Sequence, residues 1–158
     1  MDEPVQGMRE LMAGFDALPA LLQRKVMTQV MRAGGRPIVR RARGKVHNVS
    51  GRLARSIRVT VVRRAGQVIA RIVAGRNLKK DDPYYAVMVE LGTKPHEIRP
   101  AGKKSLFLAG LFAEVVQHPG AKAEPFLLPA LEEGADEALA AMQEELGAQI
   151  EALGGLAG

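Results

Sequence analysis

The first regular pattern along the chain is helical. Apolar residues recur three or four positions apart after Asp16 and Pro19, a pair typical of a helix N-cap and first turn. These apolar positions are Leu18, Leu22, Val26, Val30 and Ala33. Because residues 34–37 contain two glycines and a proline, we predict a kink or break before the helix resumes over residues 38–45.

From Ser56 the hydrophobic period changes to two. Apolar and polar residues alternate up to Arg63 and again over residues 68–73, around a short turn that contains Gly66. This pattern predicts a β-hairpin. A turn is expected at residues 48–51 and a polar loop at residues 76–83.

A second hairpin or strand pair is predicted between Ile98 and Val116. Its two apolar runs are residues 106–108 and 113–116, which flank an Ala-Gly pair. A second helix is predicted to begin near Pro129. Its apolar face comprises Leu131, Ala135, Leu139, Met142, Leu146, Ile150 and Leu153, and its acidic face Glu132, Glu133, Asp136, Glu137, Glu144 and Glu145.

The order helix, strands, helix predicts an α+β fold. We expect an antiparallel β-sheet of two hairpins packed against a long N-terminal helix and a C-terminal helix. At 158 residues the chain is long enough to bury one core. We therefore predict a single domain over residues 1–153, with a flexible segment at residues 1–16 and a disordered tail at residues 154–158.

Charge is distributed unevenly along the chain. The 23 Lys and Arg exceed the 17 Asp and Glu, yet Ala17 to Lys80 contains no acidic residue at all. From Asp81 onward acidic residues predominate. Such a dipolar chain favours either a polyanion on its basic half or contact between its basic half and the acidic half of another copy.

Catalytic and cofactor motifs are missing from the sequence. Cysteine is absent, and the three histidines are too far apart for a zinc-binding helix motif. No serine lies in a glycine-framed elbow, and no glycine-rich phosphate loop follows a strand. We therefore expect no enzyme, no cofactor, no metal and, because no long apolar run occurs, no membrane. The acidic first 20 residues also predict no secretory signal.

Three segments, read in order, resemble one known family. They are "NVSGRLARSIRV" at residues 48–59, "YYAVMVELGT" at 84–93 and "HPGAKAEPFLLPAL" at 118–131. Their motifs are similar to Gly-x-Leu-x-x-Ser-Ile, Tyr-Ala-x-x-Val-Glu-x-Gly-Thr and Pro-Phe-Leu-x-Pro-Ala of small tailed-phage neck, tail-completion and tail-component proteins, typified by the tenth gene product of a lambdoid coliphage. The motif residues expected to be structural are Ser50, Gly51, Leu53, Ser56, Ile57, Pro125, Phe126 and Pro129.

The resemblance implies a structural virion protein of the phage head-tail junction. Members of the family are expected to form an oligomeric ring, of six copies by the family's pattern. The ring would join the tail tube protein to the head-side connector or stopper protein and let DNA pass through its lumen. Its location would be the virion, and the host cytoplasm during assembly.

The segment from Tyr84 to Pro100 is the expected contact element. Glu90 ends an apolar run and needs a counter-charge, while Gly92 permits a turn. The predicted contact residues between subunits or rings are Tyr85, Glu90, Gly92, Thr93, His96, Arg99 and His118. The predicted DNA-facing or lumen-facing residues are Arg58, Arg63, Arg64 and Arg71.

Two alternatives to the ring protein stay open from sequence. A nonspecific DNA-binding accessory protein would use the basic region at residues 24–80, where charge but no stacking aromatic is available. A hydrolase is the remote alternative, and it would depend on Glu90 or His118. In the ring hypothesis the basic half and the acidic second helix of adjacent subunits meet.

Overall fold

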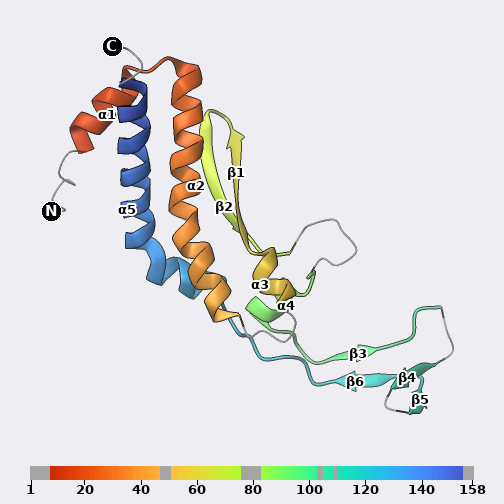
Figure 1. The fold of residues 1–158 in the computed structure, drawn as a ribbon. Coiled ribbons are helices and arrows are strands. Elements are labelled where there is room, and N and C mark those ends of the chain that lie inside the picture. The colour runs from red at the N-terminus through yellow and green to blue at the C-terminus, as the bar shows by residue number, and fades with distance from the viewer. Residues whose placement is uncertain (1–7, 47–50, 76–82, 103–104, 109, 155–158) are drawn as a thin grey trace. The chain divides into compact units, whose positions relative to one another are not determined.

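The computed structural model describes residues 8–46, 51–75, 83–102, 105–108 and 110–154 (Figure 1). Its contacts divide the chain into two compact units. Unit 1 comprises Met1–Pro83 and Phe126–Gly158, and unit 2 comprises Tyr84–Pro125. The two units are described separately below.

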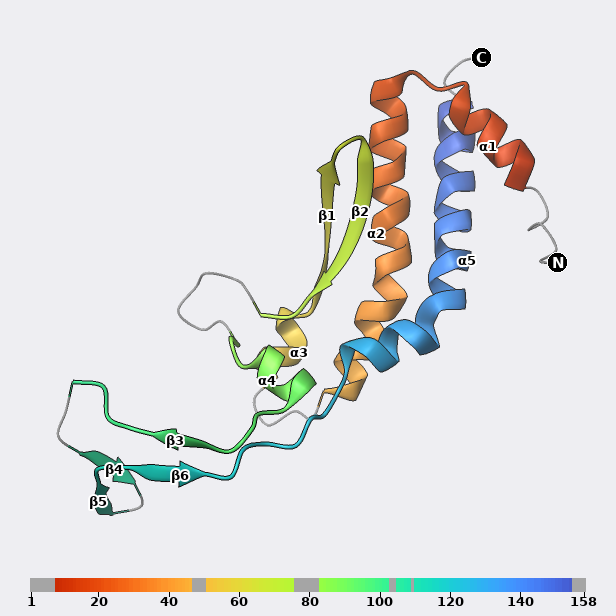
Figure 2. The same cartoon turned by 180° about the vertical axis from the view of Figure 1, so that it is seen from behind.

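Unit 1 is built on two long helices that lie side by side. They are α2 (Ala20–Lys45) and α5 (Leu127–Gly154), and Figures 1 and 2 show them paired along most of their length. Pro129 lies in the first turn of α5, where a missing amide proton costs nothing, as the sequence predicts. Buried Val26, Val30 and Leu146 form the core between the helices.

A shorter helix, α1 (Met8–Asp16), packs against α5. Leu11 and Phe15 of α1 lie against the buried core cluster. Residues 1–16 were predicted to be a flexible segment, and α1 was not predicted. Its short apolar pattern is too brief to be distinguished from a loop without the partner helix.

A kink or break was predicted at residues 34–37, and helix α2 continues through Pro37 without a break. Tertiary packing on both sides of the helix at this point outweighs the lost backbone hydrogen bond. Gly34 lies against α5, where an added Cβ would be 2.5 Å from the Met142 Cγ. Gly35 lies against the neighbouring hairpin, where an added Cβ would be 2.6 Å from a Val59 methyl. The two glycines therefore allow α5 on one side and the hairpin on the other to approach α2 closely.

The first predicted hairpin is confirmed. It comprises β1 (Arg58–Arg64) and β2 (Gln67–Val73), which pair antiparallel from Arg58↔Val73 to Arg64↔Gln67. A short helix, α3 (Arg52–Ser56), precedes it. Because side chains alternate between faces, Val59 and Arg63 share the face toward α2, while Arg64 is on the other face.

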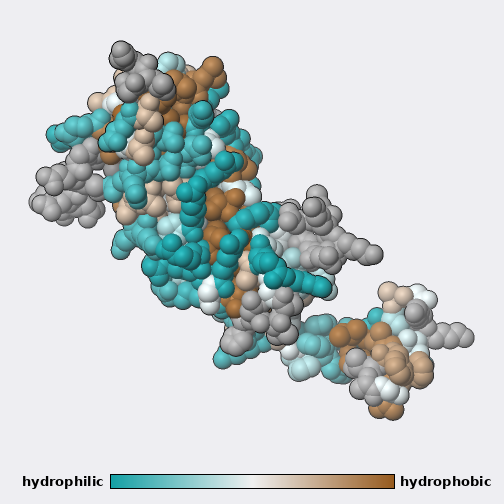
Figure 3. All heavy atoms as spheres, in the orientation of Figure 1, coloured by the Kyte–Doolittle hydropathy of each residue, from teal (hydrophilic) through white to brown (hydrophobic). Residues whose placement is uncertain are grey.

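Unit 2 contains one short helix and two pairs of three-residue strands. After α4 (Ala86–Leu91), β3 (His96–Ile98) pairs antiparallel with β6 (Val116–His118). Between them, β4 (Leu106–Leu108) pairs with β5 (Leu111–Ala113), and Figure 3 shows apolar residues gathered over this pair.

The second predicted strand pair is only partly right. Residues 106–108 form a strand, but its partner is β5 and not residues 113–116. Val116 belongs to β6 and pairs with Ile98. The α+β class is confirmed, although the described strands form three separate two-stranded sheets. A continuous apolar run has no period of two, so the strand limits could not be fixed from it.

The apolar face predicted for α5 is correct only in its second half. Met142, Leu146 and Ile150 contribute to the core. In the first half, Leu131, Ala135 and Leu139 are exposed, and the buried positions are Ala130, Gly134 and Ala138. Small residues face α2 there because they allow the two helices to approach closely.

Candidate functional site

The first family-like motif holds α3 against the end of the β1–β2 hairpin. Gly51 precedes α3 with φ of +71°, a conformation that favours glycine. Leu53 and Ile57 are buried. The buried Ser56 hydroxyl donates to the Leu53 carbonyl at 2.7 Å and accepts from the Gly75 amide at 2.9 Å. Ser50 lies outside the described residues.

Of the four predicted DNA-facing arginines, Arg58, Arg64 and Arg71 are on one face of the hairpin by strand alternation, and Arg63 is on the other. Arg58 donates to the carbonyl oxygens of Ser56 and Gly75, both at 3.0 Å, and so fixes the ends of the hairpin. Arg63 reaches α2, where it donates to the Thr28 hydroxyl at 2.8 Å. Arg64 and Arg71 are exposed on the opposite face of the hairpin.

A basic hollow forms beside the turn of the hairpin. It has a volume of 340 Å³ and is lined by Arg24 of α2, Arg63, Arg64 and the turn residues that follow. Three arginines among the residues that line one open hollow favour an anionic ligand such as a phosphate group. Sequence reasoning missed Arg24, because only the fold brings α2 next to the hairpin turn.

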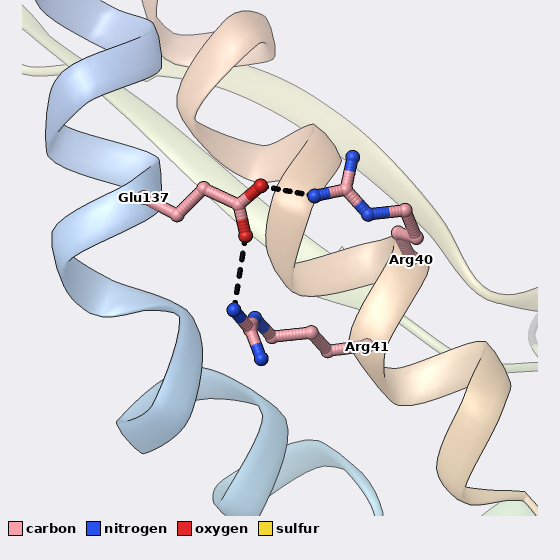
Figure 4. Close-up of polar contacts among 3 residues, drawn as sticks. All are labelled: Arg40, Arg41 and Glu137. Atoms are coloured by element: carbon pink, nitrogen blue, oxygen red, sulfur yellow. Dashed lines mark hydrogen bonds and ion pairs between the residues drawn. The ribbon is translucent and has the colours of Figure 1, made fainter.

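Charges of the basic and acidic halves also meet within the chain. Glu137 of α5 bonds to Arg40 and, at 3.2 Å, to Arg41 of α2 (Figure 4). Lys45 bonds to Glu133 at 2.7 Å. The hydrogen bond from Arg40 is the main cause that lowers the pKa of the Glu137 carboxyl. These carboxylates therefore stabilise the α2–α5 pair, in contrast to the predicted pairing of this face with a neighbouring subunit.

The base of the unit 2 ribbon is a close backbone crossing. Thr93 exchanges backbone hydrogen bonds with Ala121, at 2.9 and 3.1 Å. Gly92 has φ of +71°, and an added Cβ would lie 2.7 Å from the Ala121 oxygen. Gly120 has φ of +88°, and its added Cβ would lie 2.3 Å from the Thr93 oxygen. Both glycines are required sterically, which explains their place in the family-like segments.

The ribbon beyond this crossing carries a stacked histidine pair. His96 and His118 are cross-strand partners, and their ring centroids are 5.0 Å apart. The Gly120 amide donates to His118 Nδ1 at 3.0 Å, and His96 Nδ1 lies 2.9 Å from the Lys94 oxygen. The two predicted contact histidines are thus brought together, although they are 22 positions apart in the sequence.

A polar group of three residues lies on the same ribbon. The Arg99 guanidinium donates to Glu97 at 2.8 Å, and the Gln117 amide donates to the other Glu97 oxygen at 2.8 Å. These bonds, that from Arg99 first, lower the pKa of the Glu97 carboxyl. Glu97 was not predicted as a site residue, because one exposed glutamate gives no signal without its cross-strand partner.

The remaining predicted residues lie at the two ends of unit 2 or beside them. Tyr85 and half-buried Glu90 belong to the α4 segment, where the Tyr84 and Tyr85 rings meet edge to face. Pro125 is exposed, whereas Phe126 is only 1% exposed and is among the largest fully buried side chains of the described residues.

Large apolar side chains are exposed on unit 2. On the α4 segment they recur at helical spacing, and a second group covers the β4–β5 hairpin. The first group comprises Tyr84, just before α4, and Val87, Met88 and Leu91 on α4; the second comprises Phe107, Leu111 and Phe112 on the hairpin. Exposed apolar surface of this extent is typical of a protein interface.

Within the described ranges, no group of three or more His, Asp or Glu side chains could hold a metal ion. None of the helices in the described part of the chain is both long and apolar enough to cross a membrane.

Comparison with known proteins identifies one family. A family model described as "Bacteriophage HK97-gp10, putative tail-component" matches residues 9–92, which is more than half of the chain. The match includes the first family-like motif, the second up to Gly92, and both strands of the β1–β2 hairpin. No curated protein and no solved structure matches the chain.

Proposed function

Because the chain belongs to the HK97-gp10-like family of phage tail components, which are structural proteins and not enzymes, we propose that it acts at the head-tail junction of the virion. It is a neck, tail-completion or tail-terminator protein that assembles into a ring, of six copies by the family resemblance. The ring joins the tail tube protein to the head-side connector or stopper protein, and DNA passes through its lumen. Assembly takes place in the host cytoplasm.

The exposed apolar surface is the observation that carries the ring proposal. Two separate groups of large apolar side chains on unit 2 lack cover. Folded monomers rarely expose such surface, because removal of apolar area from water is favourable. Contacts between unlike surfaces of identical copies generate a ring when the rotation closes.

Unit 2 carries all seven residues proposed for contacts between subunits or rings. They are Tyr85, Glu90, Gly92, Thr93, His96, Arg99 and His118. The ribbon of β3 and β6 projects His96 and Arg99 as exposed side chains. Gly92 and Thr93 act indirectly, because they fix the crossing from which this ribbon extends.

Charge in the ring has a narrower role than the sequence predicts. Glu133 and Glu137 are engaged within the chain. Glu132, Asp136 and Glu144 remain exposed on α5, and they are available to basic groups of a neighbouring copy. Such contacts supply register and partner choice more than affinity.

Assembly is tested with the purified full chain. Native mass spectrometry and negative-stain images should show a discrete ring, and the ring should attach to one end of isolated tail tubes. A chain that stays single at high concentration and does not bind tail tubes would contradict the proposal.

The basic hollow supports a second candidate function, that of a nonspecific DNA-binding accessory protein. Arg24, Arg63 and Arg64 line it. If this is the main function, a single copy binds DNA with a log-linear salt dependence, and each arginine replaced by Gln lowers the slope by about one. Lys122→Gln, an exposed cation outside the basic half, is the control. A ring with weak DNA binding would favour the first candidate.

A further inference from the structure

An apolar stripe on α5 continues beyond the part that the chain itself covers. Leu128, Leu131, Ala135 and Leu139 recur every three or four residues and so share one helix face. The next members, Met142 and Leu146, belong to the core cluster, as do Leu11 and Phe15 of α1. The first members are exposed to solvent, Leu128 to 57%, Leu131 to 49% and Leu139 to 49%. One stripe is thus covered in its second half only.

The β4–β5 hairpin is the complementary feature. All six of its strand residues are apolar, and Phe107, Leu111 and Phe112 are 67%, 73% and 75% exposed. The two phenyl rings are cross-strand partners with centroids 5.0 Å apart. A two-stranded hairpin of this length is marginally stable in water by itself. A surface that covers its rings would stabilise it.

We propose that the phenylalanine end of this hairpin docks on the Leu128–Leu139 stripe of a neighbouring copy of the chain. The inference rests on the proposed ring and names one of its contacts. The sizes agree, because the stripe is about 16 Å long and each hairpin strand about 10 Å. The 13 residue-to-residue steps from Thr93 to Leu106 span at most about 45 Å when extended, and this length limits how far the hairpin can reach from the crossing at Thr93.

Charge complementarity also favours a second copy as the occupant. Exposed Glu132 and Asp136 border the stripe on α5. Lys103 and Lys104 precede β4 in the sequence, with Ser105 between them and the strand. Basic residues close to an apolar hairpin in the sequence are complementary in charge to carboxylates beside an apolar stripe, and such charges supply partner choice. The contact joins two unlike surfaces, as a ring requires.

Cysteine cross-linking tests the contact directly, because the chain contains no cysteine. Phe112→Cys and Leu139→Cys chains, each with a different affinity tag, are co-expressed and oxidised. The expected product is a covalent dimer that carries both tags. The control places the second cysteine at Ala140 instead of Leu139, on a neighbouring exposed face of α5. In this Phe112→Cys and Ala140→Cys pair the yield of cross-linked dimer should be about tenfold lower. The inference would be overturned if no cross-link forms in an intact ring. It would also be overturned if a chain that carries both Phe112→Cys and Leu139→Cys forms the disulfide only within itself.

A second experiment separates the failure of this contact from the failure of the ring. The Leu131→Gln/Leu139→Gln chain should keep its thermal unfolding, because both side chains are exposed, but should associate at least about tenfold more weakly for each leucine replaced. Leu21→Gln, also exposed but on α2, should associate normally. If the original chain is a ring and the double variant is equally stable as a ring, only this contact is wrong. If the original chain is a monomer, both the ring and the contact are wrong.

Discussion

Gly35 of α2 lies against Val59 of β1 so closely that an added Cβ would come within 2.6 Å and 2.7 Å of both valine methyl groups. Valine is branched at Cβ and held in a strand, so it cannot rotate away freely. Gly34, its neighbour, faces Met142, whose unbranched side chain can adjust. The double glycine therefore joins α2 to a stiff neighbour on one side and an adaptable neighbour on the other.

Gly35→Ala should lower the free energy of unfolding by about 1–3 kcal/mol, because the hairpin must shift away from α2. Gly34→Ala should have a smaller effect, because rotation of Met142 relieves the closest contact and leaves only the Ala138 carbonyl oxygen at 3.3 Å. Gly44→Ala is the matched control, since no atom lies within 4 Å of the added Cβ. In this case the gain in helix propensity should stabilise the protein by up to about 1 kcal/mol. Chemical denaturation measures all three, and equal effects of Gly35→Ala and Gly44→Ala would contradict the packing argument.

Ser56→Ala should destabilise unit 1 by about 1–3 kcal/mol. The substitution removes the acceptor of the Gly75 amide and leaves this donor unsatisfied in a buried position. Thr28→Ala is the control, because its hydroxyl bonds are exposed and its loss should change the free energy of unfolding by less than about 0.5 kcal/mol. Hydrogen exchange at the Gly75 amide provides a local measurement. Unchanged exchange in Ser56→Ala would mean that this amide does not depend on Ser56.

The two stacked histidines should be different neutral tautomers. His96 Nδ1 faces the Lys94 carbonyl, which only accepts, so this nitrogen must carry the proton. His118 Nδ1 accepts from the Gly120 amide, so its proton must be on Nε2. Nitrogen-15 chemical shifts of the neutral rings distinguish the two forms. The same tautomer at both positions would show that the ribbon turns are not formed as described.

The sequence predicts those parts of the fold that have a regular period. The helical spacing after Asp16 and the alternation after Ser56 both correspond to real elements, α2 and β1. Pro37 is the exception, because its local propensity favours a break at a point where packing on two sides maintains the helix. The short strands of unit 2 have no period, since their apolar runs are exposed on more than one side.

Residues of the candidate site could be predicted only where they belong to a short sequence motif. The family-like motifs led to Ser56, Gly92 and His118, which the structure places in specific contacts. The pairing of Arg40 with Glu137 joins residues 97 positions apart, and nothing in the local sequence indicates it. Long-range partners of this kind depend on how the helices pack, which a charge count cannot supply.

Acid should weaken the α2–α5 pair through Glu137. Its pKa in the folded state is below the ordinary value of 4.5, chiefly because Arg40 donates a hydrogen bond to the carboxylate. A carboxyl with a lowered folded pKa stabilises the protein fully above its unfolded pKa, and this contribution is lost as the pH falls through the lower folded value.

Glu137→Gln should therefore be less stable than the original chain at neutral pH, and the difference should shrink below about pH 4.5. Glu144→Gln, an exposed change on the same helix, is the control and should show little difference at either pH. Denaturation curves across this range in low salt measure the effect, and high salt should reduce it because the pair is exposed to solvent. A stability difference that does not change with pH would mean that the charge of Glu137 plays no part in holding the two helices together.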